Sequence, residues 1–317
     1  MKTKPLTLLT TLITLSVAVA SWAQSETEYK RTEDLIYHRK FGTALTLDVF
    51  QPAKPNGYGV IFMVSGGFFS SHDSINVGFF KPFLNRGYTV FPVVHGSQPK
   101  FAITEIEQDI QKAVRFIRHN AKKYGVNPDK LGITGGSAGG HLSLTMAVKG
   151  AKGKADAKDP VERESSEIQA VACFFPPTDF LNYGEPGEDA VGVGTLKGFK
   201  AAFGPRSDTP EDRQKLGREI SPIYFVHSNM APILIIHGDA DKLVPIYQAE
   251  KFVEKCREQG SIAKLIVRPG KDHGWPEMGQ DLEILADWFD EHLRGIISAP
   301  KEKSPDKAPE NSQPRTK

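Results

Sequence analysis

Cysteine is scarce in this sequence, and metal-binding patterns are absent. The 317 residues contain two cysteines, Cys173 and Cys256, and no His-Glu-x-x-His pattern, cysteine cluster or EF-hand loop. These absences exclude a disulfide framework and give metal catalysis no support, so we expect no metal and no cofactor. Cys173 lies in an apolar run and Cys256 near the end of an amphipathic helical pattern. We therefore expect one core thiol and one surface thiol rather than a bridge.

The chain also lacks an excess of charge of either sign. It has 40 basic and 38 acidic residues, and the only charged residues before Gln24 are Lys2 and Lys4. A chain that begins at Gln24 would therefore carry 38 of each sign. Such a surface has no general attraction to the phosphates of nucleic acid or to anionic lipid, so neither is expected as a partner.

Long apolar runs are absent except near the N-terminus. The run from Leu6 to Ala20 follows two lysines, is interrupted by four threonines and ends just before Ser21-Trp22-Ala23. A short run of this kind with small residues after it is typical of a cleaved signal peptide rather than of a permanent membrane span. We predict a signal peptide over residues 1–23, export to the periplasm or the cell exterior, and no stable membrane span after its removal.

The remaining sequence divides into one long domain and a short tail. Residues 24–297 have the length of a single large α/β domain. Residues 298–317 contain four prolines and many charges but no large apolar side chain. Such a segment cannot bury enough surface to offset its loss of conformational entropy, so we predict a disordered tail.

Strand and helix patterns alternate through the long domain. Residues 34–39 and 44–50 alternate in polarity around Gly42, which predicts an opening antiparallel hairpin. Helical patterns are clearest over Glu105–Tyr124 and Met278–Ile296. This order predicts a mostly parallel sheet with helices on both faces. The buried strands are expected at Gly59–Val64, Tyr88–Val94, Lys130–Thr134, Gln169–Phe175, Pro232–Ile236 and Ala263–Val267.

A serine flanked by glycines follows one of these strands. Residues 135–139 read Gly-Gly-Ser-Ala-Gly, a G-x-S-x-G pattern between the apolar run 131–134 and the helix-compatible run 141–148. On a tight strand-to-helix turn the serine hydroxyl is exposed above the free N–H groups of the helix, and the glycines permit the turn. The pattern indicates a serine hydrolase with Ser137 as nucleophile, and the alternative is a structural glycine-rich turn.

A serine nucleophile requires an imidazole base, and two histidines lie late enough in the chain. His292 falls on the polar face of a helical pattern, where a solvated side chain is expected. His273 lies in the loop after a predicted strand, within Pro269-Gly270-Lys271-Asp272-His273-Gly274. Since the order Ser, acid, His requires a base beyond the last strand, we predict His273 as the general base.

Two aspartates follow the preceding strand and are candidates for the acid that orients the base. Asp239 and Asp241 both stand just beyond a buried strand, at the sheet edge where reactive groups gather. Their spacing from the strand end favours Asp241, and we expect Asp239 to bond backbone N–H groups of its own turn. His237 ends the strand and is expected to be packed or hydrogen-bonded rather than catalytic.

The reaction also needs N–H donors for the negative oxygen of a tetrahedral intermediate. The loop Ser65-Gly66-Gly67-Phe68-Phe69 follows an early strand, where one part of such an oxyanion hole is normally found. We predict Gly67, Phe68 and Ala138 as the donors, with Gly66 as a fallback. The alternative is a Gly-Gly turn that only links a strand to a helix.

A long segment interrupts the alternation near this predicted site. Residues 181–226 are rich in glycine, proline and charge, and exceed an ordinary connection in length. We predict a cap beside the active site rather than a neutral insertion.

With its nucleophile, acid, base and oxyanion loop in this order, residues 34–296 resemble the α/β-hydrolase superfamily. Segments 125–131 and 135–142 are similar to secreted bacterial esterases of the hormone-sensitive-lipase and feruloyl-esterase-like groups. The resemblance implies an α/β-hydrolase fold and a secreted serine carboxylesterase that works through an acyl-enzyme. Small-molecule or carbohydrate esters are the implied substrates, with acetyl or feruloyl esters of polysaccharides as candidates.

Two loops depart from the pattern of those groups. Where those groups usually have a His-Gly-Gly-Gly loop, this chain has Ser65 in place of the histidine and Phe68 in place of the last glycine. The backbone N–H donors are retained, because every residue except proline has one. Phe68 and Phe69 would lie either near the substrate pocket or in the core. The second departure is in the loop around His95, where those groups often have a Tyr-Arg pair. The substrate contacts of that pair therefore cannot be inferred for this chain, and we expect a structural role for His95.

Two other functions fit the same order of residues. One is a serine peptidase of the prolyl-oligopeptidase kind, although such enzymes normally carry a large propeller before the hydrolase domain. The other is a non-catalytic binding module on an α/β-hydrolase fold, which usually lacks members of the triad. Here every triad position has a candidate, which favours the esterase.

Overall fold

The computed structural model describes residues 28–297. The predicted signal peptide at residues 1–23 and the predicted disordered tail at 298–317 lie outside the described residues. Among the described helices, none has both the length and the apolar character that crossing a bilayer requires.

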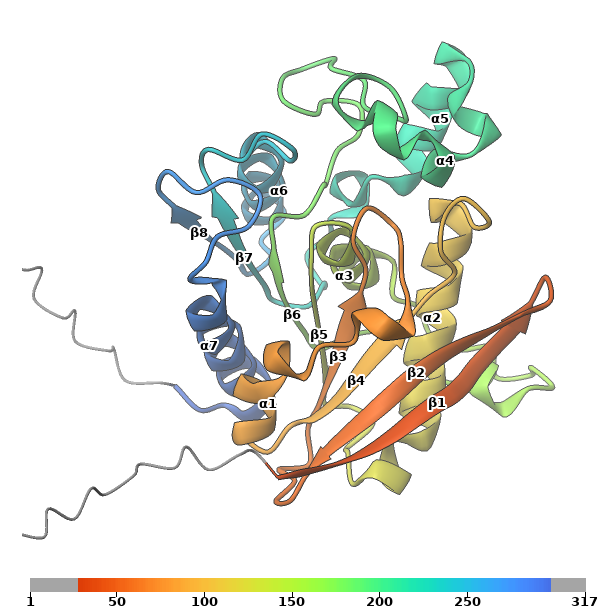
Figure 1. Cartoon of the computed structure of the whole chain (residues 1–317), viewed down its shortest axis with the longest axis vertical. Helices are drawn as coiled ribbons and strands as arrows, with labels where there is room; N and C mark the ends of the chain where they lie inside the picture. Colours follow the sequence, from red (N-terminus) through yellow and green to blue (C-terminus); the bar gives the residue numbers. More distant parts are fainter. Residues whose placement is uncertain (1–27, 298–317) are drawn as a thin grey trace, which may run out of the picture.

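An eight-stranded sheet runs through the centre of the molecule (Figure 1). The strand order is β1-β2-β4-β3-β5-β6-β7-β8, and every neighbouring pair from β4 to β8 is parallel. The predicted fold class is confirmed, because the sheet is mostly parallel and has an antiparallel hairpin at one edge. The strands are β1 Tyr29–Lys40, β2 Thr43–Pro52, β3 Gly59–Val64, β4 Thr89–Val94, β5 Leu131–Gly136, β6 Ala170–Phe174, β7 Ile233–Gly238 and β8 Ala263–Arg268.

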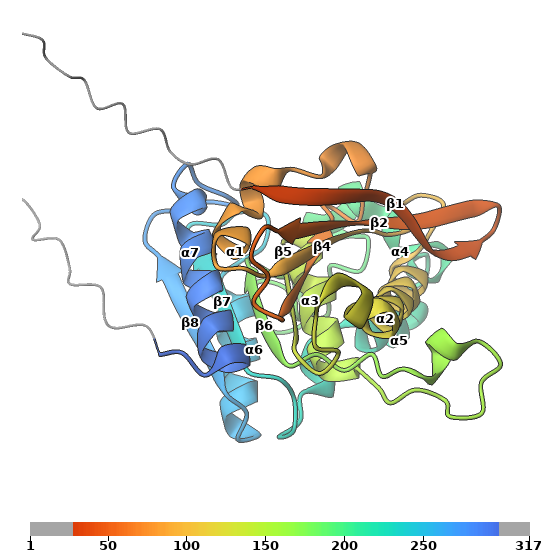
Figure 2. The same cartoon turned by 90° about the horizontal axis from the view of Figure 1, so that it is seen from below.

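Helices cover both faces of this sheet (Figure 2). Along the central strands, side chains alternate between two separate cores, as on β6, where Val171 packs on one face and Ala172 on the other. The first core contains α2, α3 and α6, and the second contains α1 and α7. The helices are α1 Lys81–Asn85, α2 Ile103–Asn120, α3 Ala138–Lys149, α4 Lys200–Phe203, α5 Pro210–Ile220, α6 Tyr247–Glu258 and α7 Met278–Phe289.

The end of the last helix and the place of one cysteine differ from the sequence-based expectations. The last helix ends at Phe289 and continues as a π-helical turn over Asp290–Arg294, which Gly295 closes at a φ of 71°. Cys256 is fully buried rather than on the surface, because it lies on the inner stripe of α6. Cys173 is buried too, and both thiols are free.

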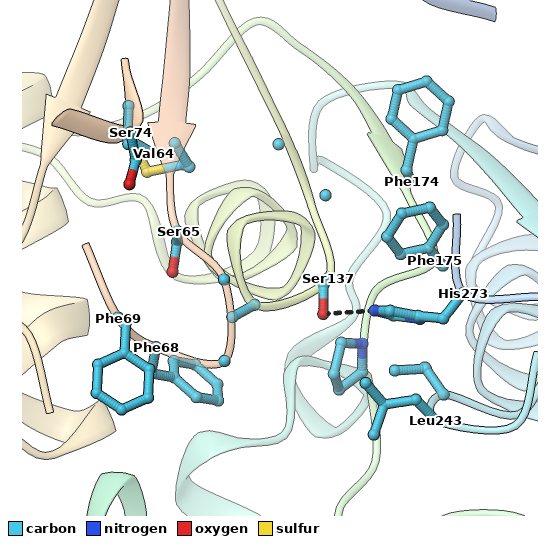
Figure 3. Close-up of a pocket in the computed structure, with 18 of the residues that line it drawn as sticks. Val64, Ser65, Phe68, Phe69, Ser74, Ser137, Phe174, Phe175, Leu243 and His273 are labelled. Carbon is cyan, nitrogen blue, oxygen red and sulfur yellow. Dashed lines mark hydrogen bonds between the residues drawn. The ribbon is translucent and has the colours of Figure 1, made fainter. Parts of the chain in front are cut away.

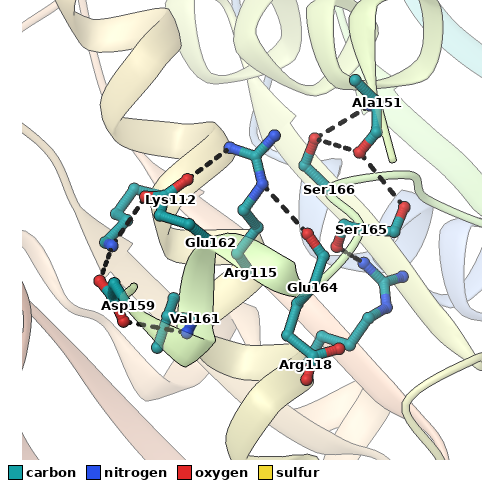
Figure 4. Close-up of polar contacts among 10 residues, drawn as sticks. All are labelled: Lys112, Arg115, Arg118, Ala151, Asp159, Val161, Glu162, Glu164, Ser165 and Ser166. Carbon is teal, nitrogen blue, oxygen red and sulfur yellow. Dashed lines mark hydrogen bonds and ion pairs between the residues drawn. The ribbon is translucent and has the colours of Figure 1, made fainter. Parts of the chain in front are cut away.

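The connection between α3 and β6 is held against α2 by polar contacts (Figure 4). Lys112 on α2 pairs with Asp159 at 2.5 Å and with Glu162 at 2.7 Å. Arg118, also on α2, donates to backbone carbonyls of Ser165 and Glu167. No residue of this connection lines the cavity described below, so it supports the scaffold rather than the site.

Residues 181–226 fold into short helices beyond the carboxyl ends of the strands (Figure 1). Thr209 caps α5 by accepting a hydrogen bond from the amide of Asp212 at 3.2 Å, and Pro210 occupies the first helical turn. Arg213 then fixes α5 to the preceding loop through Asp189 at 2.6 Å. The segment thus lies over the sheet edge where the predicted site residues are found.

Candidate active site

Ser137 lies at the junction of β5 and α3. Its φ of 55° and ψ of −121° are a combination that residues other than glycine seldom adopt. A Cβ added to Gly135 would lie 2.7 Å from the backbone of Gly139, and one added to Gly139 would lie 2.9 Å from the carbonyl oxygen of Met63. The two glycines therefore allow α3 to begin directly against the strands. This close approach holds the strained turn that carries the serine.

The imidazole of His273 reaches Ser137 from the loop after β8. Its Nε2 lies 2.9 Å from the Ser137 hydroxyl oxygen (Figure 3). Phe175, the residue after β6, packs against the imidazole with ring centroids 4.4 Å apart. This packing restricts the rotation of the His273 ring and keeps its Nε2 directed at the Ser137 hydroxyl. Phe175 lies at the end of a buried-strand pattern, so the sequence indicated a core residue and gave no signal for this contact.

Asp241, from the loop after β7, completes a row of three hydrogen-bonded side chains. Its Oδ2 lies 2.7 Å from Nδ1 of His273. A carboxylate can only accept, so Nδ1 carries the hydrogen and Nε2 is left to accept from the Ser137 hydroxyl. The structure thus brings together Ser137, His273 and Asp241, the three residues predicted from chain order.

The Asp241 carboxylate is buried but well supplied with donors. Burial by itself raises its pKa, but hydrogen bonds from His237, His273 and the amide of Val244 outweigh that effect and hold the pKa well below its usual range. His237 Nε2 donates to the Val244 carbonyl at 2.8 Å and lies 3.3 Å from Oδ2 of Asp241. His237 is therefore hydrogen-bonded behind the acid, as expected of a packed or hydrogen-bonded residue, and it does not line the cavity.

The loops that carry the acid and the base are tied to each other. The Asp239 carboxylate accepts from the Gly270 amide at 2.6 Å, and the Asp272 carboxylate accepts from the Lys242 amide at 3.0 Å. Asp239 therefore bonds the neighbouring loop, whereas its own turn was expected. The partner of His273 Nδ1 is Asp241 instead. The two cross-loop contacts hold the distance between acid and base.

The glycine loop after β3 forms a closed turn. The amide of Gly66 donates to the Phe69 carbonyl at 3.0 Å, and the amide of Phe69 donates to the Gly66 carbonyl at 2.9 Å. Between them, Gly67 has a φ of 55° and Phe68 a φ of 64°. Within residues 28–297 no acceptor is found for the amides of Gly67, Phe68 or Ala138. Gly66, the fallback donor, has its amide occupied by Phe69.

His95 supports this loop from behind. It is buried, its Nδ1 lies 2.8 Å from the Gly96 carbonyl, and its Nε2 lies 2.8 Å from the Ser65 hydroxyl. The carbonyl can only accept, so Nε2 accepts from Ser65. Burial lowers the pKa of His95 to about 4, against the opposing effect of the Gly96 bond. His95 does not line the cavity, so its contacts are those of the structural residue that was expected.

A cavity of about 540 Å³ opens over Ser137. Ser137, His273 and Phe68 line it (Figure 3). Gly67 and Ala138 line it as well. Both aromatic residues of the glycine loop face it, with Phe68 buried and Phe69 53% exposed. The other walls are mainly apolar and come from β3, η2 (Val77–Phe79), β6, α7 and the cap: Phe62, Phe79, Phe174, Tyr183, Leu196, Phe199, Met278 and Leu282.

One group among residues 28–297 has ligand atoms close enough together to hold a metal ion, namely Glu33, Asp48 and His72. None of the three lines the cavity. The guanidinium of Arg31 already pairs with Glu33 at 2.8 Å and with Asp48 at 2.6 Å. A cation is thus already present in this group, and the residues do not fit an additional metal ion.

Comparison with known proteins gives a family match that covers most of the domain. The family model described as BD-FAE matches residues 47–256. The matched part includes Ser137 and Asp241 and ends before His273.

Several curated relatives are named as esterases. The chain is 32% identical over 158 residues to esterase LipQ of Mycobacterium tuberculosis, a match that covers 48% of this chain and 34% of LipQ. It is 26% identical over 265 residues to an acetylxylan esterase of Xylanibacter ruminicola, which covers 80% of this chain and 48% of that protein. The chain thus spans about a third to a half of the length of these two relatives.

A solved structure described as a truncated carbohydrate esterase from gut microbiota matches the fold more completely. Its TM-score is 0.72 at 26% sequence identity, and the match covers 85% of this chain and 99% of that one. The family match, the relatives and this structure together support an ester-bond hydrolase.

Proposed function

Because the chain belongs to the BD-FAE family of the α/β-hydrolase superfamily, we propose that it is a serine carboxylesterase that cleaves carboxylic esters through an acyl-enzyme on Ser137. The observation that carries the proposal is the hydrogen-bonded row from Ser137 to His273 to Asp241, which begins at the cavity wall. Beside it lie the amides of Gly67, Phe68 and Ala138, for which residues 28–297 provide no acceptor.

In the first half of the reaction, the Ser137 oxygen attacks the ester carbonyl carbon while its proton passes to Nε2 of His273. Asp241 stabilises the imidazolium that forms, because its low pKa keeps it ionised. The amides of Gly67, Phe68 and Ala138 receive the negative carbonyl oxygen. Collapse of the intermediate transfers the proton from His273 to the departing alcohol and leaves the acyl group on Ser137.

In the second half, His273 takes a proton from water, and the resulting hydroxide attacks the acyl carbon. The same amides stabilise the second tetrahedral oxyanion. The proton then returns from His273 to Ser137 as the carboxylic acid leaves, which restores the starting hydrogen-bonded row.

We propose esters of carbohydrates as the substrate class, with acetyl or feruloyl as the acyl group. The names of the acetylxylan esterase and the gut carbohydrate esterase support this class. The mainly apolar walls of the cavity offer a place for an acyl group rather than for a charged one. The proposed setting is the periplasm or the cell exterior, supported by the apolar run between Leu6 and Ala20.

A panel of esters tests this function. We expect purified protein to hydrolyse p-nitrophenyl acetate and acetylated xylan or methyl ferulate, with slower turnover of p-nitrophenyl octanoate. Ser137→Ala should lower kcat by about a thousandfold or more, since the triad acts as a unit. Ser228→Ala, which changes an exposed serine, serves as the control. Cleavage of a proline peptide without ester turnover would instead favour a peptidase, and no turnover at all would favour a binding module.

A further inference from the structure

The three proposed oxyanion amides share a feature of their peptide units. In a planar trans peptide, the C=O of one residue points opposite to the N–H of the next. The carbonyl paired with the Gly67 amide is that of Gly66, which accepts from Phe69 at 2.9 Å. The carbonyl paired with the Ala138 amide is that of Ser137, which accepts from His141 at 2.9 Å. Each of these bonds fixes a peptide unit from the side away from the oxyanion.

The third peptide unit is held differently. The carbonyl paired with the Phe68 amide is that of Gly67, and it accepts from the side-chain Nε2 of Gln98. The backbone amide of Gln98 also donates to the Phe68 carbonyl at 3.2 Å. Gln98 therefore bonds the carbonyls on both sides of the Phe68 Cα. Of the three units, only this one depends on a side chain, so its support can be removed by substitution.

Gln98 is itself firmly placed. It is 5% exposed and lies in the loop after β4, which contacts the glycine loop at several other points. Ser97 accepts from the amide of Ser70 at 3.2 Å, and the amide of His95 donates to the Ser70 hydroxyl at 3.1 Å. These bonds fix the distance between the glycine loop and the loop after β4. The carboxamide of Gln98 is therefore held in place to donate to the Gly67 carbonyl.

We propose that Gln98 is a positioning residue for the oxyanion hole, an inference that rests on the proposed function. Its side-chain N–H orients the Gly67–Phe68 peptide and polarises it, so the Phe68 amide faces the cavity as a stronger donor. Phe68 is a non-glycine residue at positive φ, so its conformation needs such outside support. Gln98 does not line the cavity and touches no reacting atom.

Kinetics of two variants test the proposal. Gln98→Leu, which removes the donor, should lower kcat by about tenfold to a hundredfold, less than the loss of a whole oxyanion donor, while KM stays within about twofold. In Gln98→Glu, the carboxyl can donate to Gly67 only when protonated, and burial raises its pKa. The ratio of Gln98→Glu to wild-type kcat should therefore rise as pH falls, and the ratio for the exposed control Gln259→Glu should stay flat. Released acid is measured by chromatography, so the readout does not depend on pH.

A second measurement needs no turnover. In protein labelled with ¹⁵N-phenylalanine, the amide resonance of Phe68 should move in Gln98→Leu and should titrate in Gln98→Glu together with the kinetic ratio. An inactive wild-type protein would contradict the proposed function, and the Phe68 resonance would still decide the role of Gln98. An unmoved resonance, or a kcat ratio for Gln98→Glu that is independent of pH, would overturn the proposal and leave Gln98 as a structural residue.

Discussion

The two sides of the Ser137 hydroxyl are built by different means. On the side of β7 and β8, the acid and the base are held by side-chain hydrogen bonds between two loops, with Asp241 and His273 at their centre. On the side of β3 and β4, the donors are backbone amides, and their directions depend on two successive positive φ angles at Gly67 and Phe68.

This difference teaches which substitutions each side can tolerate. The acid–base side depends on the chemical identity of a few side chains, so an isosteric change of one atom can abolish its function. The oxyanion side depends on backbone shape, so within the glycine loop any side chain is allowed that leaves the turn unchanged, and the side chain that matters is that of Gln98 outside the loop. Matched pairs of substitutions can test the distinction on each side.

The largest expected effect belongs to the acid–base side. Asp241→Asn keeps the shape but removes the charge that holds the His273 tautomer, so kcat should fall about a thousandfold or more. Asp239→Asn, two residues earlier, should keep kcat within about threefold, because the asparagine side-chain oxygen can still accept from the Gly270 amide. Steady-state kinetics of both variants, with thermal melts to confirm folding, check the pair. The reverse order of the two effects would show that the acid has been wrongly assigned.

An intermediate effect is expected for a pair of glycines on the oxyanion side. In Gly67→Ala, the new methyl group would meet the Phe199 ring of the cap, and the φ of 55° would be strained. We expect kcat to fall at least about tenfold, because the turn must shift. Gly66→Ala finds open space around its added carbon, and its amide is already used by Phe69, so activity should change little. An equal fall in kcat in the two variants would contradict the idea that the geometry of this turn determines activity.

Much of the acid–base side could be predicted from the sequence. The glycines around Ser137 are required by the sharp turn, and the ends of parallel strands meet at one edge of the sheet, which places His273 and Asp241 near it. Local pattern and chain order were therefore enough to name the three side chains. The strand positions were also predicted to within about two residues, except in the hairpin, where β1 begins five residues before the predicted strand.

The oxyanion side was less accessible to such reasoning. The sequence indicated the glycine loop, but not that Gly66 and Phe69 bond each other and leave Gly67 and Phe68 between them. The contact of Gln98 with the Gly67 carbonyl depends on how two loops approach in space. Packing of Phe199 on Gly67 depends on the fold of the cap, whose short helices give weak periodic signals.

The smallest expected effect concerns the stability of the fold. His95 on the oxyanion side and Asp241 on the acid–base side should each affect stability in a different pH range. His95 is neutral when folded, with its pKa lowered to about 4, whereas an exposed histidine titrates near 6.5. As the pH falls, His95 is therefore protonated in the unfolded chain before it is protonated in the folded protein. The free energy of unfolding should fall by up to roughly 3 kcal/mol as the pH drops from about 6.5 to about 4. Asp241 has a lowered pKa, so its contribution is lost only below about pH 4.

Denaturant unfolding over this pH range checks the separation. His95→Gln should be less stable than wild type near pH 7 and should show a flatter decline between pH 6.5 and 4. Other titrating groups are common to both proteins and cancel in the difference. Parallel curves for wild type and variant would mean that His95 is not held neutral behind the oxyanion loop.

The most direct test of the whole account is a crystal structure of the protein inactivated by a p-nitrophenyl alkylphosphonate, whose tetrahedral phosphorus mimics the intermediate. We predict phosphorus bonded to the Ser137 oxygen, with its free oxygen about 2.7–3.1 Å from the amides of Gly67, Phe68 and Ala138. His273 should remain hydrogen-bonded to Asp241. Phosphorus on another residue, or a free oxygen turned away from those amides, would contradict the account.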